Sequence, residues 1–172
     1  QRMAAFRVQG YWKDVGTLTS LWDANMDMLS PDSGLDLSDE SWPIYARSVD
    51  APPIYMGGDS HVSHSAINRG CDIEGTVENS VLSPRVTIEK GARVSYSVIL
   101  PGVTVEAGSV IEYAIIGEGC HIGRECRVGG TPDSAPGGKW DLTVLAPDCA
   151  LEDGREIAPG VMLDRYGKEV LK

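Results

Sequence analysis

A chain of 172 residues, 42% of them hydrophobic, is long enough for one domain and part of another. Its formal net charge of −10 disfavours nucleic acid as a partner, because an acidic surface repels phosphate backbones. No apolar run approaches the roughly 18 residues of a membrane-spanning helix, and the first residues lack the apolar stretch of a secretory signal, so we expect a cytoplasmic protein that does not bind membranes.

The N-terminal residues predict one extended segment and one helix. Residues 4–15 are typical of a strand, and residues 19–29 predict a helix that Thr17 or Thr19 caps. The helix is amphipathic, because its apolar residues recur at steps of three and four. These apolar residues are Leu18, Leu21, Trp22, Met26 and Leu29.

Aliphatic residues recur with a single period through most of the remaining chain. Three columns keep intervals of 15, 17 and 17 residues, with steps of five or six inside each period. This pattern predicts a triangular coil of three short strands, each with one large aliphatic residue pointing inward, stacked about 4.8 Å from the next coil. We therefore predict an all-β fold, a left-handed parallel β-helix of hexapeptide repeats with about six coils. The columns are Val62, Val77, Val94, Ile111 and Val128; Ile67, Leu82, Ile99 and Ile116; and Ile73, Ile88, Val105 and Ile122.

The four cysteines are predicted to be small interior residues of this coil. Cys71, Cys120, Cys126 and Cys149 each precede an aliphatic position by two residues, which places them on the same, inward side of a strand. The sequence has no CxxC pair, and the cysteine and histidine spacings do not match a zinc site. Reduced thiols with a packing role are the expected state.

Residues 129–142 interrupt the period with Gly, Pro and polar residues, and they predict a loop that leaves one corner of the coil. A tolerated surface insertion explains such a loop; a contact with a partner subunit or domain is the alternative, to which Trp140 points. The whole chain then divides into an N-terminal unit (1–34), a linker rich in Asp, Ser and Pro (35–58) and the β-helix (59–172).

Hexapeptide β-helices occur in many acyltransferases and in several sugar nucleotidyltransferases, and the N-terminal motifs discriminate between them. Residues 10–17 read GYWKDVGT and residues 21–27 read LWDANMD, followed by WPIY at 42–45 and GTVENSVL at 75–82. In combination these stretches resemble the C-terminal portion of bacterial glucose-1-phosphate adenylyltransferases.

The resemblance implies that residues 1–34 are the end of an α/β nucleotidyltransferase domain. The family makes ADP-glucose and pyrophosphate from ATP and glucose 1-phosphate, with Mg²⁺, in glycogen biosynthesis. Its members are usually homotetramers whose β-helix packs on the catalytic domain, mediates oligomerisation and helps to form sites for allosteric regulators. No glycine-rich phosphate loop occurs in this chain, so we expect it to be part of a longer protein and inactive alone.

One candidate for the chemistry remains in the chain. Trp12, Asp14, Gly16 and Thr17 match the family motif Trp-x-Asp-x-Gly-Thr, whose aspartate helps to hold Mg²⁺ beside the phosphates. The resemblance makes Asp14 a metal ligand, and Trp12, Lys13 and Asp14 substrate-binding candidates, in the longer protein only. The alternative role for Asp14 is to cap a turn.

Three other interpretations stay open. A non-catalytic regulatory homologue of the same enzyme would share most of these motifs, and a pyrophosphorylase for another sugar nucleotide would share fewer. A hexapeptide acyltransferase would use an outward-facing histidine, and the alternation of the strand turns His121 outward. Finally, Arg155, Arg165 and Lys168 are either contacts for an anionic effector or solvated surface charges.

Overall fold

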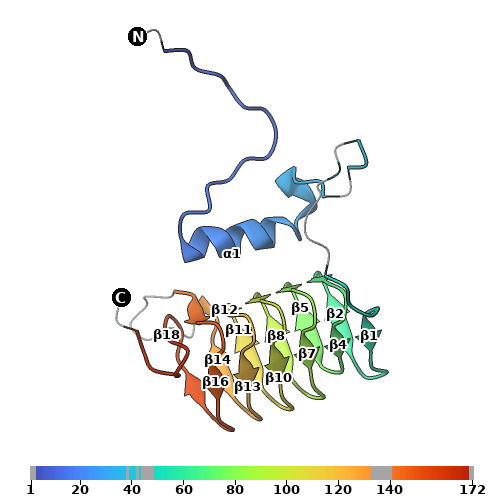
Figure 1. The fold of residues 1–172 in the computed structure, drawn as a ribbon, viewed down its shortest axis with the longest axis vertical. Helices are drawn as coiled ribbons and strands as arrows, with labels where there is room; N and C mark the ends of the chain where they lie inside the picture. Colours follow the sequence, from blue (N-terminus) through green and yellow to red (C-terminus); the bar gives the residue numbers. More distant parts are fainter. Residues whose placement is uncertain (1–2, 38, 42, 44–48, 133–140, 171–172) are drawn as a thin grey trace.

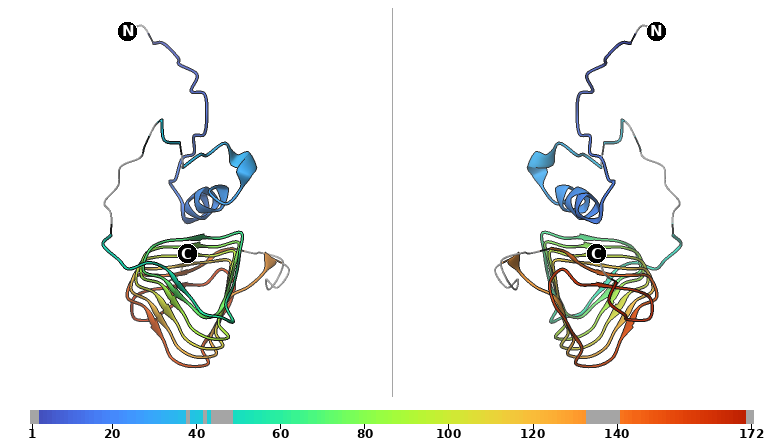
Figure 2. Two further views of the ribbon diagram at one scale, coloured as in Figure 1. Left: turned by 90° about the vertical axis from the view of Figure 1, so that its right-hand side faces the viewer. Right: turned by 90° about the vertical axis from the view of Figure 1, so that its left-hand side faces the viewer.

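Three parallel sheets wrap into a triangular prism in the computed structural model (Figures 1 and 2), which describes residues 3–37, 39–41, 43, 49–132 and 141–170. Sheet A contains β1 (Tyr55–Met56), β4 (Asp72–Ile73), β7 (Thr87–Ile88), β10 (Thr104–Val105), β13 (His121–Ile122) and β16 (Ala150–Leu151). Sheet B contains β2 (His61–Ser63), β5 (Thr76–Glu78), β8 (Arg93–Ser95), β11 (Val110–Glu112), β14 (Arg127–Gly129) and β17 (Glu156–Ile157). Sheet C contains β3 (Ala66–Ile67), β6 (Val81–Leu82), β9 (Val98–Ile99), β12 (Ala114–Ile116), β15 (Thr143–Leu145) and β18 (Met162–Leu163). Six coils, each with one strand per sheet, form the expected left-handed β-helix.

The aliphatic columns read from the sequence are the interior of this prism. Every pair of neighbouring column residues is also a pair in the strand register, as Val94 and Ile111 are in sheet B and Ile99 and Ile116 are in sheet C. From the second coil onward these side chains are almost fully excluded from solvent. The periodicity thus predicted both the fold and the register, because a slip of one residue would turn every aliphatic side chain outward.

Serine side chains connect the coils at the corner between sheets B and C. Ser97 Oγ donates to the carbonyl of Ser95 over 2.8 Å and accepts the amide of Ala114, in the next coil, over 3.1 Å. Ser80 does the same one coil earlier, donating to Glu78 and accepting from Ser97. The ladder gives the buried amides of Ser97 and Ala114 their acceptors, while the carbonyls of Glu78 and Ser95 also accept the amides of Tyr96 and Tyr113.

The 15-residue interval in each column has one cause, a corner of the second coil that is two residues shorter than its equivalents. Only residues 74–75 join β4 to β5, whereas residues 89–92 join β7 to β8. A methyl group on Gly75 would lie 2.3 Å from the carbonyl oxygen of Ala92, so this corner requires glycine. The Lys90 ammonium reaches past the short corner to the Asp59 carboxylate in the first coil, 3.1 Å away.

The N-terminal unit contains α1 (Leu18–Asp27) and a 3₁₀ turn, η1 (Pro31–Ser33). Thr17 caps α1 in a reciprocal pair of hydrogen bonds with Ser20, as one of the two expected caps. The strand expected within residues 4–15 is not formed. Residues 3–17 run as unpaired chain, because the element beside them is a helix, which presents side chains and no free backbone edge.

The remaining segments follow the corners of the prism. β1 lies inside the segment expected to be a linker, and it pairs with β4 as the first strand of sheet A. The insertion leaves the B–C corner between β14 and β15, and its residues 133–140 lie outside the described part of the chain. At the other end, the residues after β18 fold back, and the Val170 amide donates to the carbonyl of Met162 over 2.8 Å. This return covers part of the edge of the last coil.

Candidate functional site

The residues that carry the predicted chemistry lie on the extended segment beside α1 (Figure 1). Trp12 is 73% exposed and Asp14 is exposed, while Tyr11 and Lys13 are partly buried. This alternation is the one that extended chain imposes on consecutive side chains. The structure therefore does not gather Trp12, Lys13 and Asp14 on one face, because Lys13 turns toward α1 while its two neighbours are exposed.

Asp27, at the end of α1, anchors this segment. Its Oδ2 accepts hydrogen bonds from the Tyr11 hydroxyl over 2.9 Å and from the Lys13 ammonium over 2.5 Å. The hydrogen bond from Lys13, more than the one from Tyr11, holds the pKa of Asp27 below its usual range, so the carboxylate stays charged at neutral pH. The same bond raises the pKa of Lys13. The Lys13 charge is thus paired within the chain.

Asp14 suits one place in a magnesium site. Its carboxylate is exposed and lies over Gly16, where an added methyl group would be 3.8 Å from Oδ1. Mg²⁺ in nucleotide sites is commonly held by one or two carboxylates together with phosphate oxygens and water, so a single exposed carboxylate fits as a partial donor set. Within the described residues, no group of three or more His, Cys, Asp and Glu side chains could hold a metal by itself.

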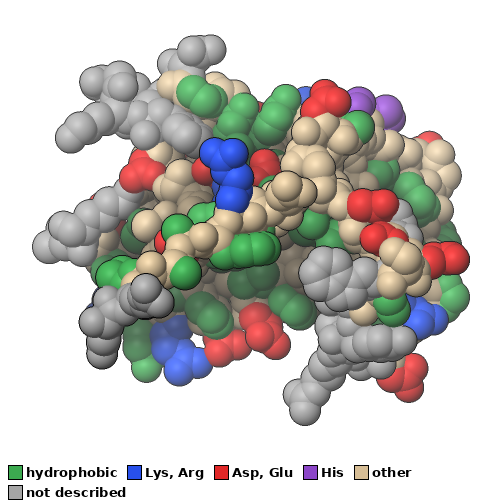
Figure 3. All heavy atoms as spheres, turned by 90° about the horizontal axis from the view of Figure 1, so that it is seen from above, with side chains coloured by type: hydrophobic (Ala, Val, Ile, Leu, Met, Phe, Trp, Pro, Cys, Tyr) green, Lys and Arg blue, Asp and Glu red, His purple; other side chains and the backbone are tan. Residues whose placement is uncertain are grey.

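Helix α1 lies on the outer face of sheet C, along the prism axis (Figures 1 and 2). Its Leu21, Trp22 and Met26 pack with Val98 and Ile115 of sheet C, which are only 2% and 3% exposed. Hydrophobic side chains gather along the middle of the face that carries α1 (Figure 3). The N-terminal unit and the β-helix are therefore joined by a second, smaller apolar core.

Trp22 is the central contact of this second core. Its indole N–H donates to the carbonyl of Tyr96 over 2.8 Å, and its ring stacks on Tyr113 with centroids 6.0 Å apart. Tyr96 and Tyr113 occupy equivalent corners of neighbouring coils, both at positive φ, and their rings stack at 4.7 Å. The sequence contains the signal for this pair, since Tyr96 and Tyr113 are one 17-residue period apart, at corner positions outside the inward-facing columns.

His121, Arg165 and Arg155 each have a partner within the chain. His121 is outward, as expected, and its Nε2 lies 3.0 Å from Glu106. Arg165 pairs with Asp148 over 2.7 Å, and Arg155 donates to the carbonyl of Gly167 over 3.5 Å.

All four cysteines are free and buried, which confirms their interior placement. Burial raises the pKa of each thiol, that of Cys120 to about 11. A thiol with so high a pKa is a poor nucleophile at neutral pH, because the reactive form is the thiolate.

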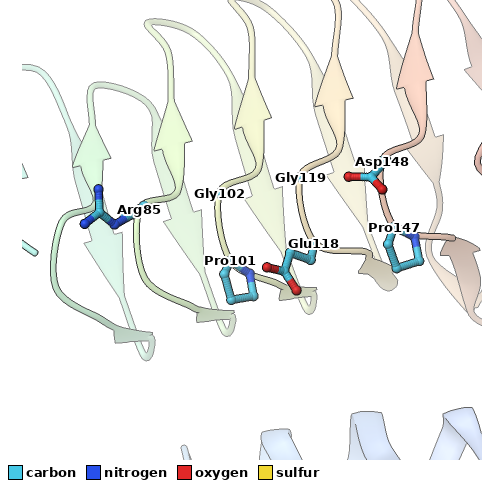
Figure 4. Close-up of a pocket in the computed structure, with 7 residues that line it drawn as sticks. All are labelled: Arg85, Pro101, Gly102, Glu118, Gly119, Pro147 and Asp148. Atoms are coloured by element: carbon cyan, nitrogen blue, oxygen red, sulfur yellow. The ribbon is translucent and has the colours of Figure 1, made fainter. Parts of the chain in front are cut away.

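A groove of about 440 Å³ follows the corner between sheets C and A (Figure 4). Its charged side chains are engaged in part, because Asp148 pairs with Arg165 and Arg85 donates to the carbonyl of Asp50. The groove therefore presents no convergent set of free polar groups. Its lining residues are Arg85, Pro101, Gly102, Glu118, Gly119, Pro147 and Asp148.

Among the described residues, no helix has the length and apolar character needed to cross a membrane.

Stacked hexapeptide coils define a left-handed β-helix, and comparison with known proteins agrees. Residues 55–140 match the family model described as GlmU-like, C-terminal hexapeptide, and the chain belongs to this family. The acetyltransferase domain of PglB from Neisseria gonorrhoeae FA1090, solved with acetyl coenzyme A, shares the fold. Its TM-score is 0.52 at 19% identity, over 70% of this chain and 58% of that domain.

Relatives with much higher identity are named glucose-1-phosphate adenylyltransferase. The chain is 52% identical to the one from Geobacillus stearothermophilus over 94 residues, which is 55% of this chain and 24% of the relative. It is 47% identical to the one from Bacillus mycoides (strain KBAB4) over 94 residues, 55% of this chain and 25% of the relative. The matched region spans about a quarter of the length of these relatives, and it supports the resemblance noted in the sequence.

Proposed function

We propose that this chain is the C-terminal portion of a glucose-1-phosphate adenylyltransferase, in which the β-helix serves assembly and regulation and does not itself transfer nucleotides. The observation that carries the proposal is the 52% identity over 94 residues to an enzyme of that name. The motif that ends at Thr17 also supports the proposal, and it lies outside the hexapeptide repeat. The longer protein would make ADP-glucose and pyrophosphate from ATP and glucose 1-phosphate in the cytoplasm, as a step of glycogen synthesis.

In this proposal the chain contributes one group to the chemistry. Asp14 supplies a carboxylate oxygen to Mg²⁺, which neutralises phosphate charge when it is bound. Trp12 is exposed beside it and free to border a substrate. The phosphate-binding basic groups must come from outside these residues, since Lys13 is paired with Asp27 and the chain as a whole is acidic.

The test is pyrophosphate release from ATP and glucose 1-phosphate by the full-length protein, with the 172-residue chain as the matched control. We expect activity in the full-length protein, a large loss of it in Asp14→Asn, and none in the isolated chain. Full-length protein that stays inactive with candidate metabolite activators present would favour the regulatory homologue or another sugar nucleotide. Activity that survives in Asp14→Asn would remove Asp14 from the metal site.

The proposed assembly is a homotetramer, and light scattering of the full-length protein measures it directly. A monomer at micromolar concentration would contradict the assembly role of the β-helix without affecting the assignment of the reaction.

The pair formed by His121 and Glu106 favours a second candidate function, that of a hexapeptide acyltransferase. The His121 side chain points outward, and its Nε2 lies within hydrogen-bonding distance of Glu106. This arrangement could orient the imidazole as a general base. The discriminating assay is acetyl transfer from acetyl coenzyme A by the chain alone, wild type against His121→Ala. If neither the wild-type chain nor the full-length protein transfers acetyl groups, this candidate is excluded.

A further inference from the structure

One carboxylate oxygen holds two residues of the segment that carries Asp14. The Tyr11 hydroxyl and the Lys13 ammonium both donate to Asp27 Oδ2, over 2.9 and 2.5 Å. We propose that Asp27 is a positioning residue for Asp14, which fixes the Tyr11–Lys13 stretch against α1 and thereby sets where the Asp14 carboxylate lies. The metal role of Asp14 itself rests on the proposed function.

The segment is held at both ends of the helix. Lys13 is tied to Asp27 at the C-terminal end of α1, and Thr17 caps its N-terminal end. Asp14 lies between these two attachment points, one residue after Lys13 and three residues before Thr17.

The anchor is placed where it does not serve the helix. A negative charge at the C-terminal end of a helix opposes the helix dipole, so an aspartate here is unfavourable for α1 alone. Its compensation comes from Lys13 and Tyr11, which belong to the preceding segment. A residue that costs its own helix stability while holding another segment is better explained by what it holds.

The contacts around Asp27 also connect the segment that carries Asp14 to the β-helix. Asp27 directly follows Met26, which packs, like Trp22, in the core between α1 and sheet C. Trp22 donates a hydrogen bond to Tyr96 and stacks on Tyr113, at the corners of the prism. Contacts therefore connect these corners through α1 and Asp27 to the residues on either side of Trp12.

The experiment compares four forms of the full-length protein: wild type, Asp27→Ala, Asp27→Asn and Asp23→Asn. Asp23 is the matched control, an aspartate one turn earlier on α1 whose charge attracts the Lys13 ammonium without being its hydrogen-bond acceptor. Three quantities are measured: the rate of tryptic cleavage after Lys13 under native conditions, kcat, and the Mg²⁺ concentration at half-maximal rate. Thermal unfolding is followed in parallel to separate positioning from stability.

We expect faster tryptic cleavage after Lys13 in Asp27→Ala, a fall in kcat of about 10- to 100-fold, and a higher Mg²⁺ requirement, because small misplacements of a reacting group are costly. Asp27→Asn, which keeps an acceptor for Tyr11, should lie between wild type and Asp27→Ala, and Asp23→Asn should lie close to wild type. An unchanged cleavage rate in Asp27→Ala would overturn the proposal, as would a loss confined to thermal stability. If the wild type makes no ADP-glucose, the proposed function fails, while the cleavage rate still decides whether Asp27 holds the segment.

Discussion

Gly75→Ala is the sharpest test of the short corner in the second coil. The added methyl group would lie 2.3 Å from the carbonyl oxygen of Ala92 and 2.8 Å from that of Glu89, both backbone atoms of the next coil. Overpacking of this kind costs about 1–3 kcal/mol. Displacing the Ala92 carbonyl also weakens its 2.9 Å bond from the Thr76 amide, which adds about 1 kcal/mol. The expected loss of unfolding free energy is therefore about 3 kcal/mol.

Gly102→Ala is the matched control for this variant. Gly102 has a φ of +69°, and an added methyl group meets nothing within 4 Å, so its substitution carries only the backbone strain of about 1–2 kcal/mol. Urea unfolding of the 172-residue chain measures both variants against wild type, with the denaturant slope checked for equality. Equal losses in the two variants would refute the steric account of the corner.

The remaining predictions concern three other contacts. Trp22→Ala should speed amide exchange in α1 by roughly 10- to 100-fold while the β-helix exchanges as before, and Trp22→Phe should have a smaller effect, because it loses only the bond to Tyr96; equal protection of α1 in all three proteins would contradict the docking role. Ser97→Ala leaves the Ala114 amide buried without its partner, while the Ser95 carbonyl keeps its bond from the Tyr113 amide, so urea unfolding should show a loss of about 1–3 kcal/mol, and a loss below about 0.5 would show that the ladder is dispensable. Burial raises the pKa of Cys120 from 9.0 to about 11, so folding favours the neutral thiol. Stability from this group is complete below pH 9 and falls by up to about 1.4 kcal/mol per pH unit between pH 9 and about 11, and Cys120→Ala should show a flatter pH profile in the same range.

The interior of the β-helix was predictable because it repeats. Every coil must bury one aliphatic side chain per strand, so the same period appears in three columns of the sequence, one for each sheet. Val94 and Ile111 are neighbours in one of these columns. The odd 15-residue interval was visible too, but its cause was not. A sequence shows that two residues are missing, and only the structure shows that the loss falls at Gly75, where the next coil comes too close for a side chain.

The contacts outside the repeat were not predictable, because they are made once. Trp22 and Tyr96 lie 74 residues apart, and no period relates a helix in the N-terminal unit to a corner of the third coil. The bonds from Tyr11 and Lys13 to Asp27 depend on the helix lying antiparallel to its own leading segment, which composition does not encode. The prediction of a strand in residues 4–15 was wrong for a related reason. A strand requires a second strand to pair with, as well as a favourable composition.

The outward residues of sheet A lie in a row with a regular spacing. Asp72, Thr87, Thr104, His121 and Ala150 follow one another in register from coil to coil. Neighbouring strands lie about 4.8 Å apart, so two positions of this row that are one, two, three or four strands apart are separated by about 5, 10, 14 or 19 Å. Cysteine labels placed pairwise on this row would calibrate a spectroscopic distance measurement inside the molecule itself, because the four native thiols are buried and slow to react.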